Sequence, residues 1–250
     1  MLLKNRIALV TGAGSGLGRA IAIAYAQEGA TVILLGRRQE ALEESYDLIA
    51  DQGGSATIVP LDLEKELPRV SELAATIAQR FGLLDILVNN AAQLGALTPM
   101  TGYEPAMWES ILRVNLTAPF FLTRELMPLL KRSNNASVIN LSSGVALHGR
   151  AYWGAYAASK AALMNLTETW AQEMTNNIVR LNSVNPGGTA TDMRATAFPG
   201  EDPATLPSPE QVVPIFLYLA SHHAKEIQGR HLDAREWMHW TPPKEKPSIQ

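Results

Sequence analysis

Apolar, β-branched runs alternate with longer helical patterns along almost the whole chain. The runs that we expect to form strands are RIALVTG (6–12), TVILLG (31–36), ATIVPL (56–61), LDILVNNA (84–91), SVINLSS (137–143) and VRLNSVNPGG (179–188). Helical patterns follow them from Gly16, over 41–50 and 70–81, and around 107–130 and 152–174. Several strand runs are apolar without alternation, as is usual where helices cover both faces of a sheet. The chain therefore predicts an α/β fold with a doubly wound parallel sheet.

The length and composition fit one such domain. The chain has 250 residues, of which 46% are hydrophobic, enough to fill a sizeable core. We expect a single domain over 1–240. Within it we expect a lid at 189–209, because this Pro-, Gly- and Thr-rich stretch is long for a loop in a compact domain. The last residues, 241–250, contain three prolines and two lysines and predict an irregular C-terminal tail.

Charge and cysteine content exclude several classes of function. There are 21 Lys and Arg against 24 Asp and Glu, a net charge of −3, so no positive field would attract nucleic acid or an anionic membrane. The absence of cysteine rules out disulfides, thiolate metal sites and a cysteine nucleophile. The adjacent His222 and His223 lack a metal-ligand spacing, so we expect no metal site. No apolar stretch reaches the ~18 residues of a membrane span, and the first run is too short for a signal peptide. We expect a cytoplasmic protein whose partners are small molecules.

A glycine-rich turn separates the first strand run from the first helical pattern. In TGAGSGLG, the glycines are Gly12, Gly16 and Gly18, with Gly14 between them. Glycine allows a tight turn and a close approach of the backbone to a pyrophosphate, whose charge the helix N-terminus favours. Glycines also mark ordinary turns, but a strand before and a helix after this turn favour a dinucleotide-binding site.

The end of the second strand run bears on the choice between NAD and NADP. An NAD site carries an acidic residue about twenty positions beyond the glycines for the ribose 2′-hydroxyl, whereas a 2′-phosphate needs cationic donors. Here Gly36 stands at the expected acidic position, and Arg37 and Arg38 follow. Solvated charges at a helix start are the alternative reading, and we favour NADP(H). Asp62 follows the third strand run, where its carboxylate would meet the adenine amino group or cap a helix.

Taken together, these motifs resemble the short-chain dehydrogenase/reductase superfamily over about Ile7 to Leu232. The matching elements are Thr11-Gly12-x-x-x-Gly16-x-Gly18, Asn89-Asn90-Ala91, Asn115, Ser143, Tyr156 with Lys160, and Asn185-Pro186-Gly187. Ala92 replaces the glycine that usually follows Asn-Asn-Ala in the family. The resemblance implies a Rossmann-like single domain and a cofactor site made of Gly12, Ser15, Gly16, Leu17, Gly18, Arg37, Arg38, Asp62, Leu63, Asn89, Ala91, Tyr156, Lys160, Pro186, Gly187, Thr189 and Thr191.

The same resemblance selects between two tyrosines in YWGAYAASK (152–160). The family's lysine follows its catalytic tyrosine by four positions, which selects Tyr156 over Tyr152 and pairs it with Lys160. Positions i and i+4 share a helix face, so we expect the ammonium to lie beside the phenol and to lower its pKa. The resemblance also implies that this lysine bonds the nicotinamide ribose.

Two further residues complete the catalytic set that the resemblance implies. Ser143 ends a strand run and would hold the substrate oxygen, with Ser142 as the adjacent competitor. Asn115 resembles the asparagine whose backbone carbonyl holds a water molecule for proton relay.

We interpret the chain as an NADP(H)-dependent oxidoreductase that interconverts a carbonyl and an alcohol, with Tyr156 as proton donor or acceptor. The alternatives are a non-catalytic dinucleotide-binding sensor or assembly protein on the same fold, and an extended-family epimerase, which usually has a longer chain and a different glycine spacing. The resemblance implies a homodimer or homotetramer, with Leu112, Leu116, Leu163 and Leu166 as candidate packing positions. Candidates for a substrate pocket are His148, Arg150, Trp153, Met193 and Phe198.

Overall fold

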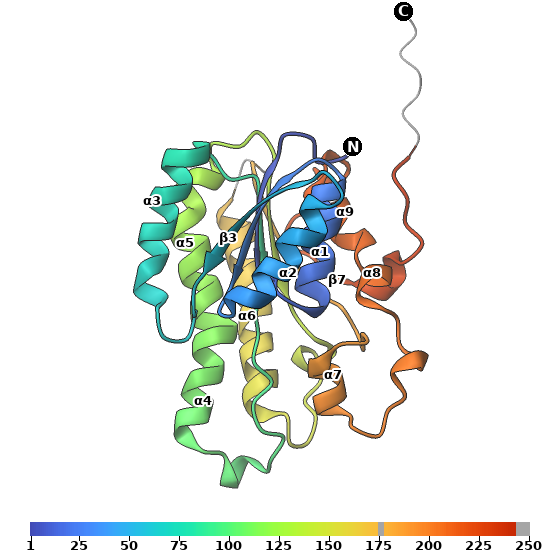
Figure 1. The fold of residues 1–250 in the computed structure, drawn as a ribbon. Coiled ribbons are helices and arrows are strands. Elements are labelled where there is room, and N and C mark those ends of the chain that lie inside the picture. Colours follow the sequence, from blue (N-terminus) through green and yellow to red (C-terminus); the bar gives the residue numbers. More distant parts are fainter. Residues whose placement is uncertain (175–177, 244–250) are drawn as a thin grey trace, which may run out of the picture.

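The computed structural model describes residues 1–174 and 178–243 (Figure 1). Within them, seven strands form one sheet in the order β3-β2-β1-β4-β5-β6-β7, and every neighbouring pair is parallel. The strands are β1 (Ile7–Thr11), β2 (Thr31–Gly36), β3 (Ser55–Pro60), β4 (Ile86–Asn89), β5 (Ala136–Leu141), β6 (Val179–Asn185) and β7 (His231–Asp233). The predicted doubly wound parallel sheet is confirmed.

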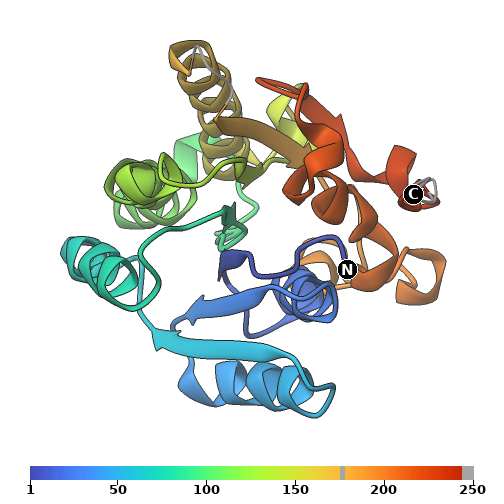
Figure 2. The ribbon, with the colours of Figure 1, turned by 90° about the horizontal axis from the view of Figure 1, so that it is seen from above.

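Helices cover both faces of the sheet (Figures 1 and 2). On one face lie α1 (Gly16–Gln27), α2 (Gln39–Ala50) and α9 (Pro214–Ala220), and on the other α3 (Val70–Phe81), α5 (Ala118–Leu130) and α6 (Gly154–Glu173). Each face has its own apolar core, with Ile21 and Phe216 buried in the first and Leu73 and Leu126 in the second. Burial on both sides explains why the strand runs are apolar without alternation.

Two helices differ from their predicted bounds. The pattern at 107–130 forms α4 (Pro105–Leu112), a π-helical segment η3 (Arg113–Thr117) and then α5. The helix predicted from Tyr152 begins at Gly154, because Tyr152 has a φ of 75°, in the left-handed region that interrupts a right-handed helix. Irregular backbone of both kinds is common near functional sites.

The direction of the strand order reverses between β1 and β4. The chain runs outward from β1 through β2 to β3 and then returns to β4 on the other side of β1. In open α/β sheets this reversal leaves a crevice at the carboxyl ends of the two strands, where ligands bind. Thr11 ends β1 and Asn89 ends β4, so the fold brings the glycine turn and the Asn-Asn-Ala motif together.

The predicted lid at 189–209 is partly helical. It contains α7 (Asp192–Ala197), the short 3₁₀ helix η5 (Pro203–Thr205) and the first residue of α8 (Pro209–Val212). In the predicted tail at 241–250, residues 241–243 have no helix or strand, and residues 244–250 lie outside the described residues. No helix in the described part of the chain combines the length and the apolar composition needed to cross a bilayer.

Candidate active site

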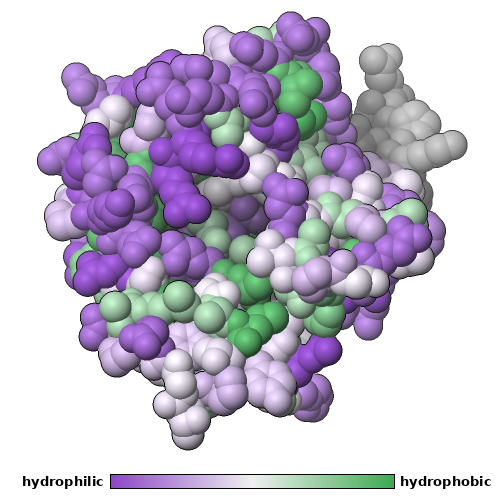
Figure 3. Space-filling view, turned by 60° about the horizontal axis from the view of Figure 1, so that its bottom comes forward, coloured by the Kyte–Doolittle hydropathy of each residue, from purple (hydrophilic) through white to green (hydrophobic). Residues whose placement is uncertain are grey.

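A pocket of about 390 Å³ is lined mainly by residues at or after the carboxyl ends of β1, β2, β3, β4, β5 and β6. Figure 3 shows the face with this hollow, between mainly hydrophilic side chains on one side and hydrophobic ones on the other. The predicted site residues that line it are Gly12, Ser15, Gly16, Leu17, Gly18, Arg37, Arg38, Asp62, Leu63, Ala91, Ser143, Tyr156, Lys160, Pro186, Gly187, Thr189 and Thr191. Two predicted residues, Asn89 and Asn115, are not among those that line the pocket.

The glycine turn leaves a backbone cradle at one end of the pocket. Gly12 and Gly16 have φ values of 66° and 49°, which side chains other than glycine rarely adopt. A Cβ atom on Gly18 would lie 2.2 Å from the carbonyl oxygen of Gly12, so only glycine fits there. Ser15 precedes α1, and its hydroxyl makes no capping bond to the helix. These features fit an anionic group held by backbone N–H groups at a helix N-terminus.

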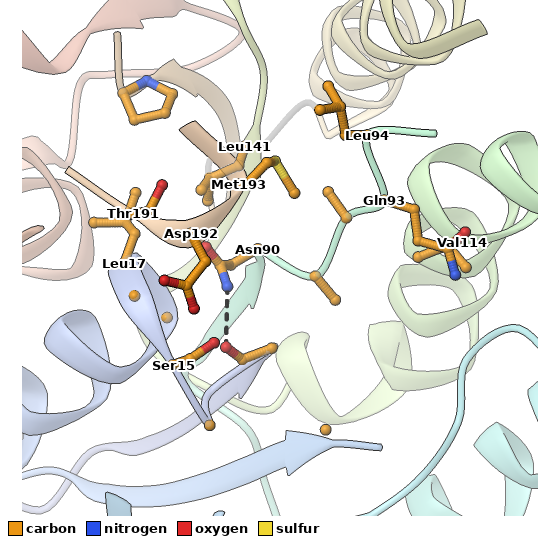
Figure 4. A pocket seen from close by; sticks show the side chains of 18 of the residues that line it. Ser15, Leu17, Asn90, Gln93, Leu94, Val114, Leu141, Thr191, Asp192 and Met193 are labelled. Carbon is orange, nitrogen blue, oxygen red and sulfur yellow. Dashed lines mark hydrogen bonds between the residues drawn. The ribbon is translucent and has the colours of Figure 1, made fainter. Parts of the chain in front are cut away.

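Hydrogen bonds join the glycine turn to the end of β4. The Thr11 hydroxyl accepts from the backbone N–H groups of Asn90 and Ala91, both at 2.9 Å, and the Asn90 side chain donates to the Thr11 carbonyl at 2.8 Å. Asn90 points toward the glycine turn in Figure 4. Asn89 instead faces the protein interior, where its amide donates to Asn140 at 2.7 Å. Its side chain therefore supports the sheet below the pocket.

The cationic corner predicted for a 2′-phosphate lies at the end of β2. Arg37 and Arg38 are exposed, and neither guanidinium makes an ion pair or hydrogen bond within residues 1–174 and 178–243. Asp62 lines the same region, and its carboxylate accepts from the backbone N–H of Glu64 at 2.9 Å, which fixes a turn. This corner fits a ligand with an additional phosphate.

Tyr156, Lys160 and Ser143 meet at the other end of the pocket. Tyr156 lies in the first turn of α6 and Lys160 one turn later, while Ser143 follows β5. The Ser143 side chain is hydrogen-bonded to the Tyr156 phenol. The Lys160 ammonium donates to the Leu141 carbonyl at 2.7 Å and lies 5.8 Å from the centre of the tyrosine ring. Ser142 is also buried beside the pocket, but its hydroxyl has no partner among the described residues.

The expectation that Lys160 lowers the pKa of Tyr156 is wrong for this structure. Burial raises the pKa of Tyr156 to about 12, and the Ser143 hydrogen bond opposes only part of that rise. Burial also lowers the pKa of Lys160 to about 8. Desolvation has a larger effect on both pKa values than any attraction between the two charges. The reason is that Tyr156 and Lys160 are almost completely buried and that the ammonium bonds a carbonyl rather than the phenol. The phenol is therefore protonated at neutral pH, which is the state that a proton donor requires.

The lowered pKa of Lys160 predicts a pH-dependent stability. Because the folded-state pKa of about 8 is below the ordinary value of 10.5, the cost of burying the charge is full below pH 8 and disappears as pH rises toward 10.5. The free energy of unfolding of the wild type should therefore rise relative to that of Lys160→Met between about pH 7 and about pH 9.5. Urea unfolding at both pH values measures this difference. Lys131→Met, at an exposed lysine, is the control and should show the wild-type pH dependence. A constant difference between wild type and Lys160→Met would show that Lys160 is not destabilised by burial.

The Asn115 side chain joins its own segment, η3, to the loop that carries Gln93 and to α6. It lies in the π-helical segment η3 and is completely buried. Its side chain accepts from the Gln93 backbone N–H at 2.8 Å and donates to the Gln93 carbonyl at 2.9 Å. It also lies 3.1 Å from the Ser159 hydroxyl, which donates to the Tyr156 carbonyl at 2.7 Å. The asparagine side chain thus supports the start of the Tyr156 helix.

A polar cluster that no sequence motif indicated lies beside Asn115. Gln93 and Glu64 line the pocket, and Ser110 of α4 lies behind them. Glu64 accepts from Ser110 at 2.7 Å and from the Gln93 amide at 2.9 Å. The three residues are far apart in sequence and match no motif, so no pattern in one sequence signals their contact.

The residues after β6 complete the pocket. Gly187 has a φ of 68°, and its backbone N–H donates to the Asn185 side chain at 3.0 Å. Thr189 donates to the Pro186 carbonyl at 3.2 Å, and the Thr191 hydroxyl caps α7 by accepting from the Arg194 backbone N–H at 3.3 Å. Both hydroxyls therefore shape this turn and keep acceptor capacity toward the pocket.

An apolar wall adjoins Tyr156. The side chains that form it are Leu94, Leu141, Trp153, Met193 and Ala197. Figure 4 shows Leu94, Leu141 and Met193 on the same side of the view, away from Ser15. The Trp153 ring lies edge-on to Tyr156 at 5.8 Å and 5.6 Å from Phe198. The other three predicted pocket residues, His148, Arg150 and Phe198, are not among the residues that line the pocket, and Arg150 stacks over the Trp153 and Phe198 rings.

Comparison with known proteins agrees with this geometry. The short chain dehydrogenase family model matches residues 6–202. The uncharacterised oxidoreductase YciK of Escherichia coli strain K12 is 42% identical over 237 residues, which cover 94% of this chain and 93% of that protein.

Two solved structures are similar over nearly the whole chain, and both are described as short chain dehydrogenases. One, from Escherichia coli CFT073 in complex with NADPH, has 42% identity and a TM-score of 0.90, covering 94% of this chain and 98% of that one. The other, from Shigella flexneri 2a strain 301 in complex with NADP, has 41% identity and a TM-score of 0.91 with the same coverage. The fold, the motifs and these relatives together show that the chain belongs to the short-chain dehydrogenase family.

Proposed function

We propose that the protein is an NADP(H)-dependent oxidoreductase that interconverts a carbonyl compound and an alcohol. The observation that carries the proposal is the meeting of Ser143, Tyr156 and Lys160 beside one continuous pocket, whose other end is a glycine cradle with two exposed arginines. A sensor would need the cradle but not the buried phenol, hydroxyl and ammonium.

The cofactor assignment is supported from two sides. Gly36 leaves no carboxylate to receive a ribose 2′-hydroxyl, while Arg37 and Arg38 offer cationic donors for a 2′-phosphate. The two similar structures described above contain NADPH and NADP. Gly12, Ser15, Gly16 and Gly18 would hold the pyrophosphate, and Lys160 is placed to reach the ribose beside Tyr156.

The residues around Tyr156 suit reduction. When bound, NADPH would supply the hydride for the carbonyl carbon. The Ser143 hydroxyl donates to the substrate oxygen, and Tyr156 transfers its phenolic proton to the same atom. Lys160, whose ammonium lies 5.8 Å from the centre of the Tyr156 ring, would hold the nicotinamide ribose beside the phenol. Asn115, through its backbone carbonyl, would hold a water that restores the proton.

The wall beside Tyr156 favours a substrate with an apolar carbon skeleton. Its side chains are aliphatic, aromatic or thioether. Two polar side chains that line the pocket are already bonded within the protein: Arg194 makes two bonds to Glu201, at 2.6 Å and 2.7 Å, and Asn90 donates to Thr11. A polyhydroxylated carbonyl compound would therefore lose hydrogen bonds to water without replacing them.

A matched panel of carbonyl compounds tests the proposed function. NADPH oxidation should be fast with aryl or cycloalkyl ketones and aldehydes, and kcat/KM should exceed that for polyhydroxylated aldehydes by more than about tenfold. A preference for the polyhydroxylated compounds would refute the substrate class. No oxidation with any member, in protein that binds NADPH, would refute the oxidoreductase assignment.

The segment at 189–209 is proposed as a lid over the pocket. Thr191, Met193 and Ala197 in and before α7 line the pocket, so a movement of α7 would change access to Tyr156.

We expect a homodimer or homotetramer in solution. Leu163 is 1% exposed and faces the protein interior, so it is not available for subunit contact. Leu112, Leu116 and Leu166 are half-buried on the neighbouring helices, and Phe120 stacks on Trp170 at 5.5 Å. These apolar side chains of α4, η3, α5 and α6 would pack across a two-fold axis. Light scattering at micromolar concentration should give a multiple of the chain mass, and a monomer mass would refute the expectation.

A further inference from the structure

Glu64 occupies a position that joins the two ends of the pocket. It follows Asp62 and Leu63 at the adenosine end, and Arg37 is near enough for its charge to favour ionised Glu64. On its other side the carboxylate accepts from Ser110 at 2.7 Å and from the Gln93 amide at 2.9 Å. The hydrogen bonds from Ser110 and Gln93 are the main causes of the lowered pKa of Glu64, so the carboxylate is ionised at neutral pH.

Gln93 connects Glu64 to Asn115, near the catalytic end of the pocket. Its side chain is held by Glu64, and the Ser110 hydroxyl lies 3.0 Å from its amide oxygen. Its backbone makes both hydrogen bonds of a pair with the Asn115 side chain, at 2.8 Å and 2.9 Å. From Asn115 the contacts continue through Ser159 to the backbone of Tyr156. One hydrogen-bonded path therefore runs from Glu64 to the first turn of α6.

The segment that Glu64 holds has an irregular backbone. Residues 90–99 form no helix or strand, although they carry Gln93 and Leu94 along the pocket. The hydrogen bonds to Glu64 and Asn115 therefore help to fix the position of Gln93, in place of a regular helix or strand. A change in this segment would displace Asn115, which is in an irregular π-helical segment rather than a regular helix.

We propose that Glu64 is a positioning residue for the reaction, acting through Gln93 on Asn115 and thereby on the start of the Tyr156 helix. The proposal rests on the proposed function, since Asn115 and Tyr156 are its proton-transfer residues. It assigns to Glu64 an effect on turnover rather than on cofactor affinity. Removing a carboxylate beside Arg37 removes a charge that would repel a bound 2′-phosphate, so NADP(H) binding should not weaken.

A double-mutant cycle tests whether Glu64 acts through Gln93. Glu64→Ala and Gln93→Ala should each lower kcat by about tenfold, and the double variant should also lose about tenfold rather than about a hundredfold, because both changes break one path. Glu109→Ala is the matched control, since Glu109 is an exposed carboxylate next to Ser110 that makes no hydrogen bond or ion pair within the described residues. Its kcat should stay at the wild-type value. An unchanged kcat in Glu64→Ala, or losses that multiply in the double variant, would overturn the proposal.

Two readouts that need no turnover separate this proposal from the proposed function. The dissociation constant of NADPH, measured by calorimetry, should be no higher for Glu64→Ala than for the wild type. The backbone N–H of Gln93 should exchange with deuterium faster in Glu64→Ala than in Glu109→Ala, because its bond to Asn115 is less well held. Unchanged exchange, or weaker NADPH binding in proportion to the loss of kcat, would refute the positioning role. If the wild type turns over no carbonyl compound while the exchange still accelerates, the proposed function fails and the structural link remains.

Discussion

Tyr156→Phe will lower kcat by about 10²- to 10⁴-fold, because it removes the proton that the substrate oxygen needs in the transition state. The phenol is 9% exposed and is hydrogen-bonded to Ser143, so the oxygen is held where a substrate carbonyl would meet both groups. Phenylalanine keeps the ring and its edge-to-face contact with Trp153. The loss should therefore appear in kcat, with the dissociation constant of NADPH nearly unchanged.

The chain provides a matched control for this prediction. Tyr152→Phe makes the same chemical change four positions earlier, in a side chain that is 58% exposed and outside the pocket lining. Its kcat should stay close to that of the wild type. Steady-state rates and NADPH titrations on both variants measure the contrast. A Tyr156→Phe enzyme with wild-type turnover would remove Tyr156 from the proton-transfer step.

Arg37→Ala will sharply reduce the preference for NADP(H) over NAD(H). The wild-type preference should be about ten- to a hundredfold, since charge-assisted bonds to the 2′-phosphate are worth roughly 1.5 to 3 kcal/mol each before solvent screening of these exposed arginines. Gly36→Asp should move the preference toward NAD(H), because the new carboxylate repels the phosphate and accepts from the ribose hydroxyl. A Cβ atom on Gly36 would lie 3.2 Å from the buried Leu42 side chain, which would have to shift by a few tenths of an ångström to accept the change.

Calorimetric titration with the four nucleotides measures the cofactor preference. Arg113→Ala is the control, because Arg113 is exposed, lies outside the pocket lining and makes no ion pair or hydrogen bond in the described part of the chain. Arg38→Ala shows whether the second arginine shares the role. Equal affinities of the wild type for NADP(H) and NAD(H) would identify Arg37 and Arg38 as solvated surface charges.

The fold was predictable because its signals are local. Each apolar run precedes a helical pattern, and the pattern at 70–81 coincides with α3, which ends where Gly82 adopts a φ of 78°. The start of α6 and the π-helical segment at Arg113–Thr117 were not predictable. Both depend on packing around the pocket rather than on the periodicity of the residues that form them.

The candidate site was predictable where a motif fixes both residue type and spacing. Tyr156, Lys160 and Ser143 were found in this way, and all three line one pocket. The Glu64 and Gln93 contact joins residues 29 positions apart that match no motif. The raised pKa of Tyr156 was also missed, because a spacing of four places Lys160 on the correct face but gives no information on burial or on the ammonium bond to Leu141.

The central claim is that the pocket transfers hydride from NADPH to a carbonyl carbon, with Tyr156 supplying the proton. The most direct test is a reduction of an aryl ketone with NADPH that carries deuterium at both positions of the nicotinamide C4, followed by mass spectrometry of the alcohol. We expect one deuterium on the carbinol carbon with the wild type and Tyr152→Phe, and almost no alcohol with Tyr156→Phe. Alcohol without deuterium, or equal deuterated product from Tyr156→Phe, would contradict it.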